Sequence, residues 1–289
     1  MSKKSVLVTG ASSGLGLAAA LLLARSGFQV FAAARHVQEL PDEPGLLPVT
    51  LDVSCQASVT AAFGEIARAT DGKPLWALVN NAGICVPSPL ELLSAEELRR
   101  QLDTNVIGQL LVTQAALPQL RSSRGRVVNV TSGLGSIAVP YLGAYSIAQF
   151  AKMAFTDALR RELEHSGVSV SVVQPGAINT PIWGKFRATG QQVLAQAQPQ
   201  ARAIYGASFE TFLGQSEALA QQAVTTADDF AKVILQVLTT PHVESHYCVG
   251  NDAAEFVAMA RSLSTAELDA LFSAQMPGAQ AFAQAGGTA

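Results

Sequence analysis

Two hydroxyl side chains in the middle of the chain could move a proton. Tyr145 lies in the stretch GAYSIAQFAKMAF (143–155), and Ser132 precedes it by thirteen residues. A tyrosine hydroxyl can act as a general acid or base, and a serine hydroxyl can hydrogen-bond the oxygen that gains or loses the proton. Taken singly, such residues are more often a packing tyrosine and a strand-end serine, so the rest of the sequence must decide.

A glycine-rich turn near the N-terminus could hold a phosphate. In VTGASSGLG (8–16), Gly10, Gly14 and Gly16 stand between an expected strand and an expected helix. Glycine allows the tight turn and lets the backbone approach a pyrophosphate at the helix N-terminus. The spacing G-x-x-x-G-x-G differs from the G-x-G-x-x-G fingerprint, so this turn alone could be only a sharp connection.

An arginine follows at the end of the second expected strand. Arg35 lies about 20 residues past the glycines, where an arginine accommodates the 2′-phosphate of NADP and an acidic residue would hold the ribose of NAD. A solvated loop arginine is the simpler alternative. Together with the glycine turn, Arg35 favours NADP(H) as the cofactor over NAD.

Short β-rich apolar runs alternate with helical patterns and would position these residues. The expected strands are 5–9, 29–33, 47–51, 76–79, 126–131, 168–173 and 246–250, and the expected helices include 59–69, 95–120 and 145–165. Pro118 is expected to bend or end the second of these helices. Apolar strands that alternate with helices predict an α/β fold, a doubly wound parallel sheet of Rossmann type with helices on both faces.

The chain is predicted to form a single domain. Residues 1–250 would be the dinucleotide-binding catalytic domain, and 251–289 a C-terminal extension of it, with a frayed tail at 277–289. Residues 180–224 are rich in Gln and Ala, read as helical, and would form a lid or substrate loop. A capped helix is expected to begin at Thr225 or Thr226 and to run to about residue 240.

The composition excludes several classes of protein. The 289 residues are 49% hydrophobic and 14% charged, and the net charge of −3 gives no reason to expect nucleic acid or an anionic membrane as partner. The three cysteines lack metal-ligand spacing, so we expect no metal site and free thiols in a reducing compartment. No apolar run is long enough for a secretion signal or a membrane span. We therefore expect a cytoplasmic protein.

The motifs together resemble the short-chain dehydrogenase/reductase family over roughly residues 5–250. The matching pieces are TGASSGLG (9–16), NNAG (80–83), TNVIG (104–108), the Ser–Tyr pair and PGAINTP (175–181). DALRREL (157–163) and QPGAINTPIW (174–183) resemble its retinol and hydroxysteroid dehydrogenase branch. The resemblance implies an oxidoreductase that interconverts a small hydrophobic alcohol and its ketone or aldehyde with NADP(H). It also implies a homodimer or homotetramer that pairs through helices 95–120 and 145–165.

The resemblance also assigns roles to individual residues. Tyr145 would be the proton donor, Ser132 would bond the substrate oxygen, and Asn105 would anchor a water of the proton relay. The implied cofactor-binding residues are Gly10, Ser12, Ser13, Gly14, Leu15 and Gly16 at the pyrophosphate and ribose, Asp52 and Val53 at the adenine, Asn80, Ala82 and Gly83 beneath the cofactor, and Pro175, Gly176, Ile178 and Thr180 at the nicotinamide.

One position departs from the family pattern. Gln149 stands where the family has a lysine, one helical turn after Tyr145. That lysine lowers the tyrosine pKa and bonds the nicotinamide ribose, whereas glutamine can keep only the ribose bond. Losing the cation predicts a roughly 10- to 1000-fold drop in tyrosinate at neutral pH. Lys152 is the obvious substitute, but we expect it to be a solvated or interface lysine.

Three explanations of Gln149 stay open. It is a natural variation in an enzyme of reduced or altered activity, a deliberate substitution that traps a complex, or the mark of a sensor or scaffold that binds NADP(H) without turnover. The presence of Ser132, Tyr145 and Asn105 favours a surviving oxidoreductase. The apolar residues of the lid, which either contact a hydrophobic substrate or pack the lid on the domain, are Ile182, Trp183, Phe186, Ile204, Tyr205, Phe209, Phe212 and Leu213.

Overall fold

Seven parallel strands form one sheet at the centre of the protein. The structure is a computed structural model that describes residues 3–275. The strands are β1 (Ser5–Thr9), β2 (Gln29–Ala34), β3 (Leu46–Thr50), β4 (Ala77–Asn80), β5 (Arg126–Val130), β6 (Ser169–Pro175) and β7 (His246–Val249). Their order in the sheet is β3-β2-β1-β4-β5-β6-β7. The predicted doubly wound sheet and its strands are confirmed, with boundaries that differ by a residue or two.

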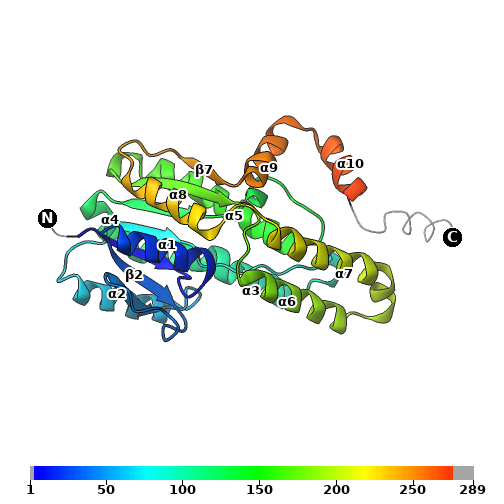
Figure 1. Ribbon diagram of the computed structural model, residues 1–289, viewed down its shortest axis with the longest axis horizontal. Coiled ribbons are helices and arrows are strands. Elements are labelled where there is room, and N and C mark those ends of the chain that lie inside the picture. The colour runs from blue at the N-terminus through cyan, green and yellow to red at the C-terminus, as the bar shows by residue number, and fades with distance from the viewer. Residues whose placement is uncertain (1–2, 276–289) are drawn as a thin grey trace.

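Helices cover both faces of the sheet (Figure 1). They are α1 (Gly14–Arg25), α2 (Gln56–Ala69), α3 (Ala95–Leu102), α4 (Gly108–Ser123), α5 (Gly143–Glu162), α6 (Ile182–Gln196), α7 (Pro199–Gln221), α8 (Ala227–Thr239), α9 (Asn251–Ser262) and α10 (Thr265–Gln275). Helices α1 and α8 pack on one face, and α2, α4 and α5 pack on the other.

The alternation of side chains along each strand divides the core in two. In β1, Val6 and Val8 point to the core under α1 and α8, whereas Leu7 points to the core under α2, α4 and α5. In β2, Val30 and Phe31 divide in the same way. Because both faces are buried, the strands read as continuous apolar runs in the sequence.

The helix predicted over residues 95–120 is confirmed as one continuous helical run from Ala95 to Ser123, but it contains a π-helical turn that was not predicted. A π-helical turn, η2 (Asp103–Ile107), separates α3 from α4, and it carries the buried Asn105. Of the two effects expected of Pro118, a bend or an end of this helix, the structure excludes the end, because α4 continues to Ser123. Ala116 and Leu120 flank the proline and are fully buried against the sheet. This packing holds the helix although the proline removes a backbone hydrogen bond.

The segment after β6 forms the predicted helical lid. Helices α6 and α7 lie side by side beyond the carboxyl ends of the strands (Figure 1). The chain then enters α8, where Thr226 and Asp229 form a reciprocal capping box and confirm the predicted helix start. Helix α9 packs on β7 and on the 3₁₀ turn η3 (Gly133–Gly135). The expected frayed tail, 277–289, lies outside the described residues.

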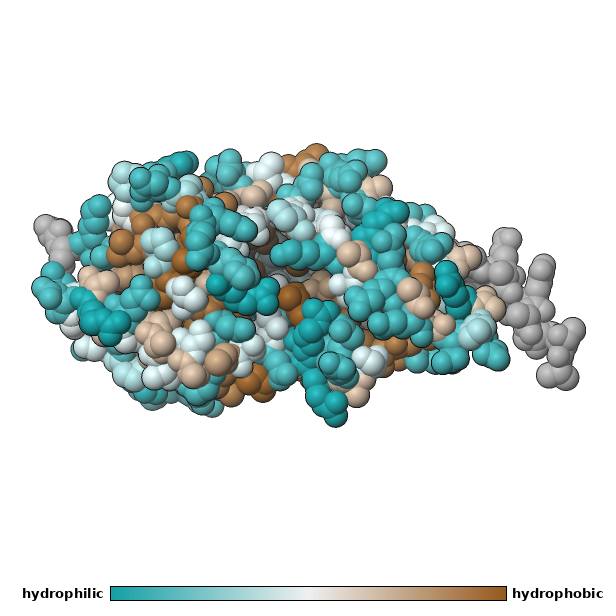
Figure 2. Space-filling model, turned by 90° about the horizontal axis from the view of Figure 1, so that it is seen from below, coloured by the Kyte–Doolittle hydropathy of each residue, from teal (hydrophilic) through white to brown (hydrophobic). Residues whose placement is uncertain are grey.

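Hydrophilic side chains dominate the face shown in Figure 2, and hydrophobic ones form small groups between them. Within residues 3–275, no helix combines the length and the apolar character that crossing a membrane requires.

Candidate active site

A cleft of about 930 Å³ opens at the carboxyl ends of the strands. It lies where β1 and β4 are neighbours, the point at which the strand order reverses, and this is where doubly wound folds bind ligands. The volume is at the upper end of the range for ligand pockets. The predicted site residues that line it are Gly10, Ser12, Ser13, Gly14, Leu15, Gly16, Arg35, Asp52, Val53, Ala82, Gly83, Asn105, Ser132, Tyr145, Gln149, Pro175, Gly176, Ile178 and Thr180.

The glycine turn is too closely packed to carry side chains. Gly10 has a φ of +67°, and a Cβ there would lie 2.9 Å from the Cα of Ala82. A Cβ on Gly16 would lie 2.3 Å from the carbonyl oxygen of Gly10. Asn81 holds the turn from β4, because its Nδ2 donates to the carbonyl oxygen of Thr9 at 3.0 Å. No side chain at Gly10 or Gly16 therefore covers the backbone N–H groups at the start of α1, as binding of a pyrophosphate there requires.

Asn80 is the one predicted site residue that does not line the cleft. It is buried under the sheet edge, where its Nδ2 donates to Thr113 and to Asn129, both at 2.9 Å. The cofactor contact predicted for Asn80 stays a prediction, and the structure places this side chain away from the cleft, because successive residues of a strand point to opposite sides. Asn81, which sequence reasoning missed, lines the cleft instead.

The adenine end of the cleft carries the charged groups expected for a nucleotide. Arg35 and Asp52 follow β2 and β3 and line the same wall. Hydrogen bonds from Ser54 hold the pKa of the Asp52 carboxyl below its ordinary value, and the charge of Arg35 lowers it further. The glycine turn, the guanidinium of Arg35 and the volume of the cleft together fit a phosphorylated dinucleotide.

The C-terminal helices complete the other end of the cleft. Asp252, in the first turn of α9, accepts a hydrogen bond from the backbone N–H of Ala177 at 2.6 Å. A Cβ on Gly176 would lie 1.9 Å from this carboxylate, so glycine is needed there. Phe256 of α9 and Phe272 of α10 also line the cleft. Sequence reasoning missed these three residues, since a helix after the last strand carries no motif.

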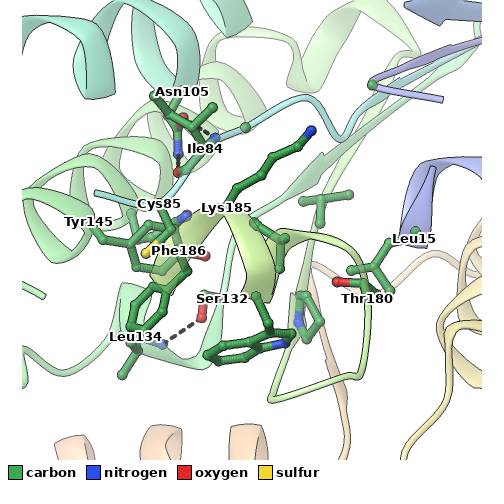
Figure 3. Close-up of a pocket in the computed structure, with 18 of the residues that line it drawn as sticks. Leu15, Ile84, Cys85, Asn105, Ser132, Leu134, Tyr145, Thr180, Lys185 and Phe186 are labelled. Atoms are coloured by element: carbon green, nitrogen blue, oxygen red, sulfur yellow. Dashed lines mark hydrogen bonds between the residues drawn. The ribbon is translucent and has the colours of Figure 1, made fainter. Parts of the chain in front are cut away.

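Tyr145 lies deep in the cleft, in the first turn of α5 (Figure 3). Burial raises the pKa of Tyr145 well above its ordinary value, and the neighbouring Cys85 thiol raises it further. Hydrogen bonding with Ser132 and Gln149 offsets only part of this rise. The Ser132 hydroxyl accepts a hydrogen bond from the backbone N–H of Leu134 at 3.2 Å, so its own proton is available to a ligand. Tyr145 is therefore protonated at neutral pH.

Asn105 positions the loop that carries Cys85. Its side-chain oxygen accepts from the backbone N–H of Ile84 at 2.9 Å, and its Nδ2 donates to the carbonyl oxygen of Ile84 at 3.0 Å (Figure 3). Both polar atoms of the side chain are thus engaged with one residue. The π-helical turn around Asn105 aims the side chain at this loop, as π-bulges near functional sites commonly do.

Gln149 and Lys152 are both only 2% exposed, one turn apart on α5. Gln149 lines the cleft, and its Oε1 is buried without a hydrogen-bond partner. The Nζ of Lys152 donates to the carbonyl oxygen of Val130 at the end of β5. The expectation of a solvated or interface lysine is therefore wrong. The turn of α5 that carries Lys152 faces the sheet, and the side chain extends along it to the strand end.

Half of the apolar lid residues face the cleft, and of the other four all but Ile204 pack within the lid or bond it to its surroundings. Ile182, Trp183, Phe186 and Phe212 line the cleft. Phe209 and Leu213 are buried in a separate cluster with Tyr141, whose hydroxyl bonds Ser208 at 2.9 Å. Ile204 is exposed, and the Tyr205 hydroxyl donates to Glu91 at 2.8 Å. The packing interpretation is therefore correct for one subset, and contact with a hydrophobic substrate stays a prediction for the residues that line the cleft.

Comparisons with known proteins agree with this geometry. The family described as short chain dehydrogenase matches residues 4–191. The 3-amino-tetrahydro-pyrrolizinone reductase of Xenorhabdus hominickii is 57% identical over 278 residues, 96% of this chain and 97% of the relative. Retinol dehydrogenase 16 of Mus musculus is 34% identical over 277 residues, 93% of this chain and 87% of the relative.

A solved structure extends the similarity. The short-chain dehydrogenase of Burkholderia cenocepacia, solved in complex with NADP, has a TM-score of 0.72 and 25% identity, and the match covers 93% of this chain and 97% of that one. The predicted likeness to the retinol dehydrogenase branch is confirmed by the mouse relative.

Proposed function

Because the chain belongs to the short-chain dehydrogenase family, we propose that it is an NADP(H)-dependent reductase of a compact, mostly apolar ketone. The observation that carries this proposal is Tyr145, protonated beside Ser132 in a dinucleotide-sized cleft. The name of the 57% identical relative adds the substrate class, a bicyclic amino-ketone of the pyrrolizinone kind. Ile182, Trp183, Phe186 and Phe212 give the cleft an apolar wall that suits such rings.

The protonated form of Tyr145 is the form that reduction requires. Reduction needs a group that gives a proton to the carbonyl oxygen, and oxidation needs one that removes it. Burial raises the pKa of Tyr145, so its hydroxyl is in the donor form at neutral pH. Reduction ends with a tyrosinate and oxidation begins with one, so a less stable tyrosinate slows both directions.

In the proposed reaction, Ser132 and Tyr145 both donate hydrogen bonds to the carbonyl oxygen of the substrate. The bound cofactor supplies the hydride that reduces the carbonyl carbon and is itself oxidised. Tyr145 gives its hydroxyl proton to the oxygen, so that the ketone becomes a secondary alcohol. The tyrosinate then takes a proton back from water. Asn105 keeps the 84–85 loop in place, and Asp252 fixes the loop at Ala177 against which the nicotinamide would rest.

NADP(H) is the proposed cofactor because a cation stands where its extra phosphate would lie. Arg35 lines the cleft beside the adenine end and is exposed, with no carboxylate on its guanidinium among the described ion pairs. The structural neighbour from Burkholderia cenocepacia was solved with NADP. Residues Gly10 to Gly16 would hold the pyrophosphate through their backbone N–H groups.

The surface of α4 and α5 supports the proposed homodimer or homotetramer. Ile107 of η2, at the start of α4, and Ile147 and Phe150 of α5 are 43%, 46% and 44% exposed, and α5 contacts η2. Grouped apolar side chains on a surface commonly mark a protein interface. Cys55, Cys85 and Cys248 are free thiols, which supports the proposed cytoplasmic compartment, where thiols stay reduced.

Nucleotide binding and turnover test this function separately. We expect NADPH to quench the intrinsic fluorescence with a lower Kd than NADH, and NADPH absorbance to fall when a bicyclic amino-ketone is added. Retinal and a steroid ketone serve as comparison substrates from the branch of the mouse relative. A protein that binds NADPH but turns over none of these carbonyls contradicts the reductase and favours a sensor or scaffold. A protein that binds neither nucleotide contradicts the cofactor assignment as well.

A further inference from the structure

Lys152 is a buried cation that the mechanism above does not use. Lysines are rarely this deeply buried unless they are paired, because taking an ammonium out of water costs several kcal/mol. No ion pair among the described residues includes Lys152. The elements that surround its end of α5, namely β5, β6 and η3, contain no Asp or Glu. A buried lysine without a counterion therefore calls for a ligand.

The ammonium lies at the reacting end of the cleft. Its acceptor, the carbonyl oxygen of Val130, is two residues before Ser132 on the same strand end. Val130, Ser132, Tyr145, Gln149 and Lys152 all line the one cleft. Helix side chains lean towards the N-terminus of the helix, so Lys152 points back along α5 towards Gln149 and Tyr145. The lysine thus opens onto the cleft where the hydride would be transferred.

Gln149 and Lys152 each leave a hydrogen-bonding group unused. A lysine ammonium has three donors, and Lys152 has one acceptor, Val130. Gln149 has a buried Oε1 with no donor. Buried polar atoms without partners are uncommon, and they point to an absent ligand or water. Residues three apart on a helix lie on the same side, so the two unused groups serve the same part of the cleft.

We propose that Lys152 carries the positive charge of this active site, binding the nicotinamide ribose of NADP(H) together with Gln149 and stabilising the tyrosinate of Tyr145 after proton transfer. The inference rests on the proposed function. The two tasks that one lysine performs in the resembling family are here divided. Gln149 supplies an amide for a ribose hydroxyl, and Lys152, one turn further on, supplies the charge. The chemistry of the reaction and its proton balance are unchanged.

The protonation of Lys152 should respond to the cofactor. Burial lowers the pKa of Lys152 to about 7, so the free protein contains both the neutral and the charged form near neutral pH. A bound ribose and its phosphates favour the ammonium, and binding then takes up a proton. The titratable groups on the other elements packed against α5 are Glu96, Glu97, Arg99, Arg100, Asp103, Glu164 and His165, and those within the cleft nearby are Tyr145 and Cys85. Burial alone accounts for the lowered pKa of Lys152.

Two substitutions separate charge from structure. Lys152→Met removes the ammonium, and Lys152→Gln removes the charge but keeps a donor for Val130. Both should weaken NADPH binding about 10- to 100-fold, the range of one charged hydrogen bond. Neither should lower the Tm, because replacing an unpaired buried charge is often neutral or stabilising. Lys232→Met is the matched control, since that lysine lies exposed on α8 beside Asp229 and away from the cleft.

A swap of positions provides the most direct readout. Adding Gln149→Lys to Lys152→Met returns a cation to the cleft from the neighbouring turn, and we expect NADPH affinity to recover. If Lys152 had a purely structural role, a lysine at position 149 could not take it over, and the NADPH affinity of the double variant would not recover. Both Kd values are measured by fluorescence from pH 6 to 9. The wild-type affinity should fall as the pH rises through about 7, and that of Lys152→Met should not.

Each outcome bears on a different proposal. If Lys152→Met and Lys152→Gln bind NADPH as the wild type does at every pH, the role of Lys152 is overturned and the reductase stands. If the wild type binds no nucleotide, the proposed function fails and the inference fails with it. If both variants fail to fold, calorimetry of the wild type decides. NADPH binding should take up most of a proton about one pH unit above the pKa of Lys152, which burial lowers to about 7, and no uptake at any pH from 7 to 10 refutes the role.

Discussion

The close packing around Gly16 in the glycine turn (residues 10–16) predicts how much the substitution Gly16→Ala destabilises the protein. In Gly16→Ala the new Cβ would lie 2.3 Å from the carbonyl oxygen of Gly10 and 2.5 Å from Nδ2 of Asn81. The nearer atom belongs to the backbone and cannot rotate away, so the start of α1 must move. Overpacking of this kind costs about 1–3 kcal/mol. With an unfolding entropy of about 2.1 cal/mol/K for each of the 289 residues, that is a fall in Tm of roughly 2–5 °C.

The same displacement should reach the cofactor. The backbone N–H groups at the start of α1 are the proposed pyrophosphate donors, and each neutral hydrogen bond contributes about 1 kcal/mol. Loss of two of them lowers NADPH affinity roughly 30-fold by the same figure. The assays are thermal unfolding followed by circular dichroism, with and without NADPH, and fluorescence titration. Both measurements, the Tm and the Kd for NADPH, report on the pyrophosphate end of the cleft and do not depend on contacts of the lid with the nicotinamide.

Gly214→Ala is the control, because a Cβ there meets nothing within 4 Å on α7. It should raise helix stability by about 0.5–1 kcal/mol and leave NADPH affinity unchanged. If Gly16→Ala has the wild-type Tm and the wild-type Kd for NADPH, the proposed role of the glycine turn is refuted. The turn would then have space for a side chain at position 16, whereas the structure has none.

Three further predictions concern single side chains. Tyr145→Phe should abolish reduction and leave the Kd for NADPH unchanged, and measurable turnover in this variant contradicts the proton-donor role. Arg35→Ala should weaken NADPH about 10- to 100-fold and NADH hardly at all, as loss of a charged phosphate contact implies, and an equal loss for both nucleotides places Arg35 elsewhere. The capping box lowers the pKa of Asp229 to about 2, below its unfolded value, so its stabilising contribution is present above pH 4 and is lost as the pH falls towards 2. Asp229→Asn should remove this part of the acid dependence of Tm, and an unchanged acid profile contradicts it.

The fold could be predicted from the sequence because local and global signals agree. Strands such as Ser5–Thr9 are apolar throughout, since both faces of the sheet are covered. The π-helical turn between α3 and α4 could not be predicted, because it accompanies the bonding of Asn105 to Ile84, twenty-one residues away. Pro118 shows the opposite case. A proline commonly ends a helix, but the packing of α4 on the sheet keeps this helix going to Ser123.

The site was predictable where a motif fixes the backbone. The glycine turn and the Ser132–Tyr145 pair lie where the sequence places them, and Arg35 lines the cleft. Within the stretch 80–83, Asn81 lines the cleft and Asn80 does not, because a strand end gives no sign in sequence of which residue turns inward. Lys152 was misread because a lysine is normally exposed, and only the path of α5 over β5 shows that this one is buried. Asp252 depends on a contact across seventy-five residues.

The lid has a small core of its own, and this bears on how the enzyme could be redesigned. Phe186, Leu194, Phe209 and Leu213 pack together without using the sheet, and Tyr141 joins them from the segment just before the catalytic helix. Tyr141 adopts a φ of +65°, a conformation held by this packing and by Ser208. A transplanted α6–α7 segment would therefore bring its own interior with it, provided that it also accommodates the ring of Tyr141. Substrate preference can then be exchanged as a module while the hydride-transfer apparatus stays untouched.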